Sequence, residues 1–530
     1  MNRLFKPTLI AAALAACTSP AISYAATDTT QPNILVIIMD DLGTGQLDFD
    51  LESIDAKKLA QRPQSLRYKG DINQLMDAAK KAMPNVAELA DTGVRMTNAY
   101  VPSPVCSASR AGILTGRNAE SFGNYTNEDA GHAAVPLEVK FLPELLKDNG
   151  YTTAFIGAYD SGKTTTARVG VHQRTRDYHD NAVKTPVAGH SPLDRGFTHS
   201  YAYFTSGAAL YDSKSIFRNH ENVVSPGYTT HNFTQETINI IEASHKNNKP
   251  FFIDLSFSAP HIPLDDVAPR VYMEKFDTGN HEADKYYAHL NAADDGIGRI
   301  VAKLKELGMY DDTLILFLSD NGAVHESPMP VNGMDRGFKG QRYQGGVRIP
   351  FIAHWNGVIK PSENNDTMIS ALDILPTALS VANISIPDAL NVTGKNILPV
   401  LKGEEDKAHD YLYFAGSRLM HFGEENSTFW NDYWKFITYS SDVYPTNHHS
   451  ESVSLPEWAI RDQQWALQFH DGKFELYNYK NDPEQEHNVL ANNPEKVKEL
   501  KSEFGRWIKQ QPQPNKWAKT NHDIILNSVK

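Results

Sequence analysis

The sequence predicts an α/β protein built on a buried parallel sheet, with a smaller α+β subdomain at its C-terminal end. Three largely apolar runs without regular polar alternation, at residues 34–39, 250–257 and 313–318, are rich in β-branched and aromatic side chains. Runs without polar alternation are typical of strands that are covered on both faces. A helical spacing of apolar residues over 297–307, ended by Gly308, lies just before the third run. Strands that alternate with helices predict the α/β class.

Polar residues follow each of these predicted strands. Asp40 and Asp41 follow the first, His261 comes shortly after the second, and Asp320 and Asn321 follow the third. In such sheets, ligands bind beyond the carboxyl ends of the strands. Asp40, Asp41, Asp320 and Asn321 therefore form a candidate metal site, and ligands that are all oxygen favour Ca²⁺, with Mg²⁺ as the alternative, over zinc. Each acidic pair alone is equally well explained as a solvated turn, but two pairs after matching strands favour a metal.

Composition limits the classes of function. The 530 residues exceed one ordinary core, and a hydrophobic fraction of 41% predicts a well-packed globular protein. The net charge of -13 argues against general nucleic-acid binding, which needs a broadly basic face. An anionic substrate is compatible with this charge only if the chain forms a local basic patch.

The sequence changes character after about Lys402. Apolar runs become shorter, and six of the seven tryptophans lie in this part: Trp430, Trp434, Trp458, Trp465, Trp507 and Trp517. We therefore expect a catalytic domain over residues 27–402 and a smaller subdomain over 403–530.

The N-terminal residues 1–26 predict an export signal. A basic start is followed by a short apolar run over residues 8–16, too short to span a bilayer. Ser23-Tyr24-Ala25 fits ordinary cleavage after Ala25, whereas Leu14-Ala15-Ala16-Cys17 resembles a lipoprotein signal cleaved after Ala16 and lipidated on Cys17. Both alternatives predict a periplasmic or secreted protein. No later segment is apolar enough for a transmembrane helix.

Cys106 is the only cysteine beyond this signal. In an oxidising compartment a lone cysteine is usually either buried and inert or chemically used. Pro102-Ser103-Pro104 predicts an extended approach to a helix that starts near Cys106, with a serine available to cap it and Gly116 to end it. A helix N-terminus and the nearby Arg110 favour a negatively charged group at this position.

Cys106-Ser107-Ala108-Ser109-Arg110 fits the pattern Cys-x-Pro/Ala-x-Arg, and Leu114-Thr115-Gly116-Arg117 continues it. With these segments the chain resembles the formylglycine-dependent type I sulfatases of the alkaline phosphatase superfamily, and the resemblance covers most of the chain. Further matching segments, in the family's order, are residues 40–43, 192–197, 258–263, 318–322, 337–350 and 475–478.

The resemblance implies a mixed sheet sandwiched between helices and a site centred on Cys106. A formylglycine-generating maturation enzyme would oxidise Cys106 to formylglycine (3-oxoalanine), whose hydrate attacks sulfur. The metal ligands would be Asp40, Asp41, the converted Cys106, Asp320 and Asn321. Arg110 would hold the converted residue and balance charge. Lys339 and His261 would bind sulfate oxygens and protonate the leaving oxygen, in an order that the sequence does not assign.

One segment departs from the family pattern. After Gly157 the family continues Lys-Trp-His, but this chain has Ala158-Tyr159-Asp160. Either Lys163 substitutes as a catalytic residue, or the charge comes from elsewhere, or the activity is altered. Residues 161–190 carry the basic patch that a polyanion would need. Candidates for the missing imidazole are His172, His179 and His190, and candidates for substrate binding are His172, Arg174, His190 and Arg342.

These observations predict an exported sulfatase that acts on a sulfated carbohydrate, for instance a sulfated algal galactan such as carrageenan. The nearest alternative is a phosphoester or phosphonate monoester hydrolase of the same superfamily. A catalytically silent glycan-binding homologue is a third. The sugar, the sulfated position, endo or exo action and the oligomeric state do not follow from the sequence.

Overall fold

The computed structural model describes residues 31–530, apart from 63–67, 127–133, 166–183, 205–208, 263, 265, 365, 420–453, 471, 516 and 518. Residues Gln31–Lys530 form one compact unit, separate from Met1–Thr30. The predicted export signal and Cys17 therefore lie outside the described residues. Among the helices of the described part, none is long and apolar enough to cross a membrane.

The main sheet has ten strands in the order β13-β2-β12-β11-β1-β10-β4-β7-β8-β9. Its centre is parallel and consists of β11 (Thr313–Ser319), β1 (Asn33–Met39), β10 (Phe251–Ser256), β4 (Thr152–Ala158) and β7 (His199–Tyr203). The three strands predicted from apolar runs are confirmed as the adjacent strands β11, β1 and β10.

Both margins of the sheet depart from the parallel arrangement. On one side β12 (Phe351–His354) runs antiparallel to β11, β2 (Val94–Met96) antiparallel to β12, and β13 (Ser362–Asn364) parallel to β2. On the other side β8 (Tyr211–Arg218) and β9 (Glu221–Tyr228) form an antiparallel hairpin beside β7. The sheet is therefore mixed, as the resemblance implied.

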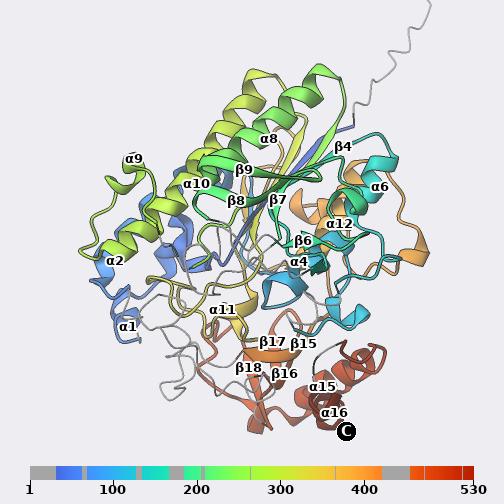
Figure 1. Ribbon diagram of the computed structural model, residues 1–530. Helices are drawn as coiled ribbons and strands as arrows, with labels where there is room; N and C mark the ends of the chain where they lie inside the picture. Colours follow the sequence, from blue (N-terminus) through green and yellow to red (C-terminus); the bar gives the residue numbers. More distant parts are fainter. Residues whose placement is uncertain are drawn as a thin grey trace, which may run out of the picture. The chain divides into compact units, whose positions relative to one another are not determined.

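Helices cover both faces of the sheet (Figure 1). One layer contains α2 (Ile72–Ala82), α3 (Pro84–Thr92), α8 (Thr229–Lys246) and α10 (His281–Glu306), and it packs on Leu35 and Ile37 of β1. The other contains α4 (Cys106–Thr115), α6 (Leu142–Asp148) and α12 (Ile374–Val381), and it packs on Ile34 and Val36. Successive side chains of β1 thus enter two separate cores, which explains why its sequence does not alternate with polar residues.

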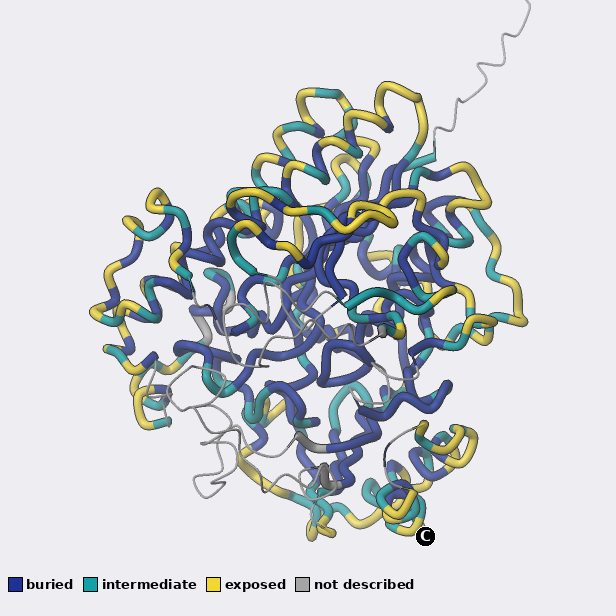
Figure 2. The backbone as a smooth tube through the Cα atoms, in the orientation of Figure 1, coloured by how far each residue is buried: buried dark blue, intermediate teal, exposed yellow. Residues whose placement is uncertain are grey.

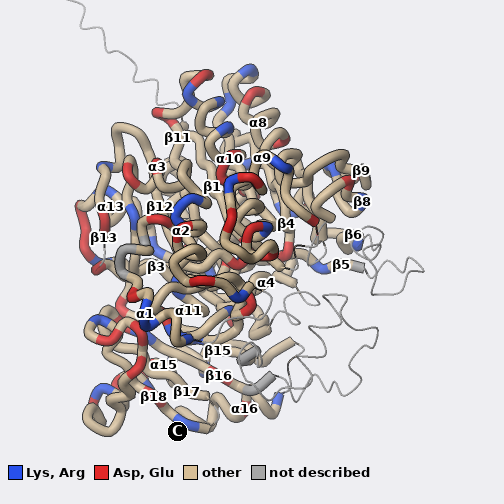
Figure 3. The backbone as a smooth tube through the Cα atoms, turned by 90° about the vertical axis from the view of Figure 1, so that its left-hand side faces the viewer, with Lys and Arg blue, Asp and Glu red and all other residues tan. Residues whose placement is uncertain are grey.

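Figure 2 shows the same arrangement as a buried centre surrounded by helices with exposed outer faces. Acidic and basic positions are interspersed along the described chain on the face shown in Figure 3. Shorter elements connect the layers: α1 (Ala56–Leu59), β3 (Ala99–Tyr100), β5 (Thr164–Thr165), β6 (Thr185–Pro186), α9 (Arg270–Met273), α11 (Gln344–Val347), β14 (Ile369–Ser370) and α13 (Leu398–Leu401).

A second, antiparallel sheet lies in the C-terminal part of the chain. Its strands are β15 (Leu412–Leu419), β16 (Ser454–Arg461), β17 (Trp465–His470) and β18 (Lys473–Asn478), and it packs against α15 (Pro494–Ile508), with α16 (Lys519–Ser528) beside β16. The core of this part is aromatic: the Trp458 ring stacks on Phe504 with centroids 4.0 Å apart. This is the predicted small α+β subdomain, whereas the boundary at residue 402 stays a prediction.

Candidate active site

The site lies where the parallel strands β1, β10 and β11 end. Asp40 and Asp41 directly follow β1, and Asp41 has a positive φ of 66°. The Asp40 N–H donates to the Ala259 carbonyl after β10 (3.2 Å), and the Asp41 N–H donates to Asp320 Oδ1 after β11 (3.2 Å). The parallel register therefore brings these three strand ends together, as the polar residues predicted.

Asn321 completes the acidic cluster from β11. Its Nδ2 donates to Asp41 Oδ1 over 2.6 Å, and both residues are fully buried. Burial raises the pKa of Asp40 well above its ordinary value, and the charge of Asp320 adds to this. Burial also acts to raise the pKa of Asp41, but Lys339, His261 and the hydrogen bond from Asn321 together lower it. Two neighbouring carboxyl groups are thus driven in opposite directions.

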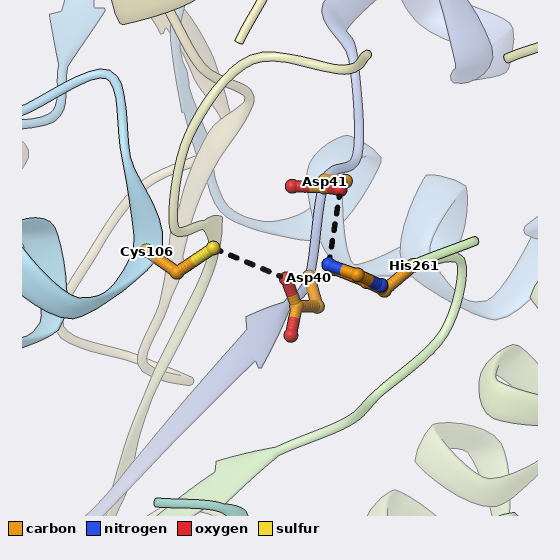
Figure 4. A group of neighbouring side chains, drawn as sticks. All are labelled: Asp40, Asp41, Cys106 and His261. Atoms are coloured by element: carbon orange, nitrogen blue, oxygen red, sulfur yellow. Dashed lines mark hydrogen bonds and ion pairs between the residues drawn. The ribbon is translucent and has the colours of Figure 1, made fainter. Parts of the chain in front are cut away.

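Cys106 is the first residue of α4, and its Sγ lies 3.9 Å from Asp40 Oδ1 (Figure 4). The predicted helix and its glycine end are confirmed, since Gly116 is left-handed at the C-cap. The expected serine cap is not found at the N-cap position, which Val105 occupies without a side-chain cap hydrogen bond. Burial raises the pKa of the Cys106 thiol well above its ordinary value, although Lys339 opposes the shift.

Arg110 lies one helical turn after Cys106 and joins the strand ends to the helix. Its guanidinium contacts Asp320 Oδ2 at 2.9 Å and Asp40 Oδ2 at 3.3 Å. It also donates to the Ala158 carbonyl at the end of β4 (3.0 Å). Burial alone would lower the pKa of Arg110, but the two carboxylates raise it, so the guanidinium stays charged.

Lys339 and His261 both approach Asp41 from loops. Lys339 Nζ lies 2.6 Å from Asp41 Oδ1, and His261 Nε2 lies 3.7 Å from Asp41 Oδ2. The loop of Lys339 is fixed by its own N–H, which donates to the Ala323 carbonyl (3.0 Å). Burial acts against the charge on Lys339, but the acidic cluster raises its pKa well above the ordinary value. Burial lowers the pKa of His261, which favours the neutral imidazole.

The cluster can hold a divalent cation. One ligand atom from each of Asp40, Asp41, Cys106 and His261 lies within 4.8 Å of the others. Asp41 Oδ2 and Asn321 Oδ1 are buried acceptors without a hydrogen-bond donor in the described part of the chain. Buried acceptors of this kind are satisfied by a cation, and carboxylate and amide oxygens match the ligand preference of Ca²⁺ or Mg²⁺. In this structure Asp320 is turned toward Arg110.

Asp160, for which the sequence predicted no role, also lies at this site. The Ser107 hydroxyl, one residue after Cys106, donates to Asp160 Oδ2. Burial raises the pKa of Asp160, and the charge of Asp320 adds to this increase. The hydrogen bond from Ser107 and the charge of Arg110 oppose it. The sequence marked this position, because Ala158-Tyr159-Asp160 departs from the family pattern. It did not predict which residue the Asp160 carboxyl group contacts.

Several predicted residues lie elsewhere. Lys163 is exposed, and His190 is half-buried beside Arg195 and Asp194, so the idea that Lys163 moves into the site is not supported. The assignment of Arg342 to substrate binding is wrong: its buried guanidinium bonds the Ser417 carbonyl (2.8 Å) and Glu457 (3.2 Å), which ties it to the C-terminal sheet. His172, His179 and Arg174 lie outside the described residues.

Comparisons with known proteins agree with this geometry. The sequence model of the sulfatase family matches residues 32–384, and that of the C-terminal region of N-sulphoglucosamine sulphohydrolase matches residues 336–445. YdeN, an uncharacterized sulfatase of Escherichia coli strain K12, is 40% identical over 486 residues, which cover 91% of this chain and 86% of YdeN. Mouse N-acetylgalactosamine-6-sulfatase is 26% identical over 489 residues, which cover 84% of this chain and 83% of the relative.

Solved structures share the fold. Ps i-CgsB in complex with k-i-k-neocarrahexaose superposes with a TM-score of 0.70 at 23% identity, covering 94% of this chain and 97% of that one. The PsFucS1 sulfatase from Pseudoalteromonas has a TM-score of 0.65 at 21% identity, with 92% of each chain covered. The fold is therefore the alkaline-phosphatase-like α/β class. The chain belongs to the sulfatase family, whose members are sulfuric ester hydrolases.

Proposed function

We propose that this protein is an exported sulfatase that removes sulfate from a sulfated carbohydrate, with Cys106 as its reacting residue. The observation that carries the proposal is the position of Cys106. It begins a helix, faces Asp40, and shares its surroundings with Arg110, Lys339 and Asp41. A sulfated algal galactan is the proposed substrate class, supported by the oligosaccharide bound to Ps i-CgsB.

The buried thiol argues for chemical conversion of Cys106 rather than for thiol chemistry. A thiol whose pKa is raised by burial and by three nearby carboxyl groups is a poor nucleophile, because the thiolate is the reactive form. Conversion to formylglycine by a maturation enzyme would supply a hydrated aldehyde. One of its hydroxyl groups would lose its proton, attack the sulfur atom and expel the alcohol, which takes up a proton. The second hydroxyl group would then lose its proton, so that sulfate is released and the aldehyde returns. Ala108 stands where the family commonly has proline, so the efficiency of this conversion depends on whether the maturation enzyme accepts alanine at this position.

The surrounding residues would bind, orient and exchange protons. Asp40, Asp41, Asp320 and Asn321 would hold Ca²⁺, with the converted Cys106 completing the ligand set, and the cation would neutralise the clustered carboxylates. Arg110 fixes Asp320 and Asp40 and would stabilise charge at residue 106. Lys339 and His261 would bind sulfate oxygens and give the leaving oxygen its proton. Lys339 already carries a proton, because the acidic cluster raises its pKa, whereas burial lowers the pKa of His261.

A pocket adjoining the Lys339 loop is the proposed seat of a neighbouring sugar unit. It has a volume of about 680 Å³ and is lined by Arg62, His325, Arg336, Phe338 and Tyr343 among others. The Arg336 guanidinium lies 4.1 Å above the Tyr343 ring. Aromatic rings with polar groups around them suit pyranose rings, which present both an apolar face and hydroxyl groups.

The test is sulfate release from a panel of defined sulfated oligosaccharides, run beside aryl sulfate and aryl phosphate esters. The enzyme is produced with and without a formylglycine-generating enzyme, and Cys106→Ala serves as the inactive control. Sulfate release that depends on Cys106 and on maturation supports the proposal. Release of phosphate alone would establish the phosphohydrolase alternative, and glycan binding without release of either anion would establish the silent homologue.

A further inference from the structure

Four carboxyl groups lie around Cys106 and the start of its helix, and one of them, Asp160, forms no ion pair in the described part of the chain. Asp40 and Asp320 contact Arg110, and Asp41 contacts Lys339. For Asp160, the hydrogen-bond partner is the neutral hydroxyl of Ser107. Asp160 lies within electrostatic range of Arg110, Asp320 and Lys339, so it belongs to the same field as the other three carboxyl groups.

The formal charge of the site depends on this fourth carboxylate. Two buried cations, Arg110 and Lys339, face four carboxyl groups, while burial favours the neutral form of His261. With all four carboxyl groups ionised, a divalent cation on the acidic cluster would bring positive and negative charges into balance. Without Asp160 the same site would carry one net positive charge. Asp160 therefore decides how much negative charge a ligand may add.

We propose that Asp160 is a specificity-determining residue: it makes the site selective for singly charged sulfuric esters over doubly charged phosphate monoesters. This inference rests on the proposed function and names the charge of the group that the site accepts. The interaction energy with a fixed carboxylate scales with the charge of the ligand, so a dianion is penalised about twice as strongly as a monoanion. The penalty acts at a partly buried carboxylate, where screening is weaker than in bulk water.

The test compares the binding of three esters to the Ca²⁺-loaded protein in a Cys106→Ala background, which prevents turnover. Phenyl sulfate and methyl phenyl phosphate carry one negative charge. Phenyl phosphate carries two at about pH 8, because the second pKa of a phosphate monoester is about 6. Dissociation constants are measured by ligand-observed NMR, and thermal melting verifies that each variant is folded.

Asp160→Asn retains an acceptor for Ser107 and removes one charge. We expect it to lower the dissociation constant of phenyl phosphate by about tenfold and those of both singly charged esters by about threefold, because the gain in binding free energy scales with ligand charge. Ser107→Ala removes the hydrogen bond that lowers the pKa of Asp160, so any change in the ratio of phosphate to sulfate affinity should follow the direction of Asp160→Asn. Asp148→Asn, at an exposed position on the surface, is the matched control for charge and should leave all three constants unchanged.

If Asp160→Asn changes the dissociation constants of all three esters by the same factor, the inference is overturned and the proposed function stays intact. The inference also fails if Asp160→Ala and Asp160→Asn change the ratio of phosphate to sulfate affinity in opposite directions, since the effect would then be steric rather than electrostatic. If none of the three esters binds to the protein that carries Asp160, the proposed function itself fails. Asp160→Ala removes the same charge with a smaller side chain and should change the three dissociation constants in the same direction as Asp160→Asn.

Discussion

At the scale of single residues, Asp41 organises the site. It accepts a hydrogen bond from Asn321, forms an ion pair with Lys339 and lies beside His261. One of its oxygens lacks a hydrogen-bond donor in the described structure. Its pKa is lowered in spite of burial, so it stays ionised and in turn keeps Lys339 protonated. Burying the ion pair of Asp41 and Lys339 costs desolvation energy that exposed ion pairs avoid. Buried charges of this kind are typical of functional sites.

Lys339→Ala is therefore predicted to lower kcat/KM for a sulfated substrate by about 100-fold or more, since a fixed cation at the reacting group contributes to stabilising developing charge. The measurement is initial-rate kinetics on fully matured enzyme. Lys140→Ala is the matched control, because Lys140 pairs with Glu144 at an exposed position. Near-normal kinetics of Lys339→Ala, with the fold intact, would contradict the role given to Lys339.

At the scale of elements, the C-terminal sheet supports the segment that carries Lys339. Tyr343 donates to Glu475 of β18 (2.7 Å), and Arg336 donates to the Tyr477 hydroxyl of β18 (2.7 Å). These two anchors flank Lys339 in the chain. His470 and the two tyrosine hydroxyls lower the pKa of Glu475 to about 2 against the opposing effect of burial, so the anchor stays ionised. The C-terminal part of the chain thus has a positioning role for the site.

Glu120 forms a second link to this sheet, and it gives a prediction for stability against pH. Its Oε1 accepts the Ala415 N–H (2.9 Å), while burial raises its pKa to about 7. At pH values between the unfolded and the folded pKa of Glu120, the folded chain holds a proton on this group that the unfolded chain has lost. The free energy of unfolding therefore falls as the pH rises toward 7. Glu120→Gln keeps the acceptor and should raise the free energy of unfolding by about 1–3 kcal/mol at about pH 8.

Chemical denaturation at about pH 4 and about pH 8 measures this effect. The difference between Glu120→Gln and the unsubstituted protein should nearly vanish at the lower pH, where the glutamate is protonated in both states. Glu138→Gln, at an exposed position, should show no such difference. A Glu120→Gln variant that is less stable at the higher pH would show that the ionised carboxylate is favourable in the fold.

At the scale of the whole molecule, the sequence predicted the centre of the fold and left its margins open. The strands β1, β10 and β11 have side chains buried on both faces, which leaves largely apolar runs without regular polar alternation. The strand β2, next to the edge strand β13, has only three residues, and β8 mixes exposed and buried positions, so neither produces such a run. Short and half-exposed strands depend on pairing with neighbours, which local sequence does not encode.

The same limit applies to the site. Asp40, Asp41, Cys106 and Arg110 were predictable because their motifs lie at strand ends and at a helix start. The exclusion of Arg342 from the site depends on Glu457, 115 residues away, and the contact of Asp160 depends on Ser107, 53 residues away. Contacts between segments so far apart in the chain decide which charged residues face the site and which are paired elsewhere.

Removal of the cation should affect the molecule as a whole, because its ligands come from separate strand ends. Chelation is predicted to lower the melting temperature, and Ca²⁺ at about 100 times its Kd should restore about 2.7 kcal/mol of stability. Differential scanning calorimetry on the full chain measures this. Asp41→Asn should lose most of the Ca²⁺ effect, and an unchanged Ca²⁺ effect in that variant would place the ion elsewhere.

The central claim is that Cys106 is converted before it acts. The most direct measurement is mass spectrometry of the tryptic peptide that ends at Arg110, taken from a preparation that releases sulfate. We predict the mass of the aldehyde or its hydrate at Cys106, in a fraction that rises with specific activity when the maturation enzyme is co-expressed. An active preparation in which this peptide carries only unmodified cysteine would contradict the account.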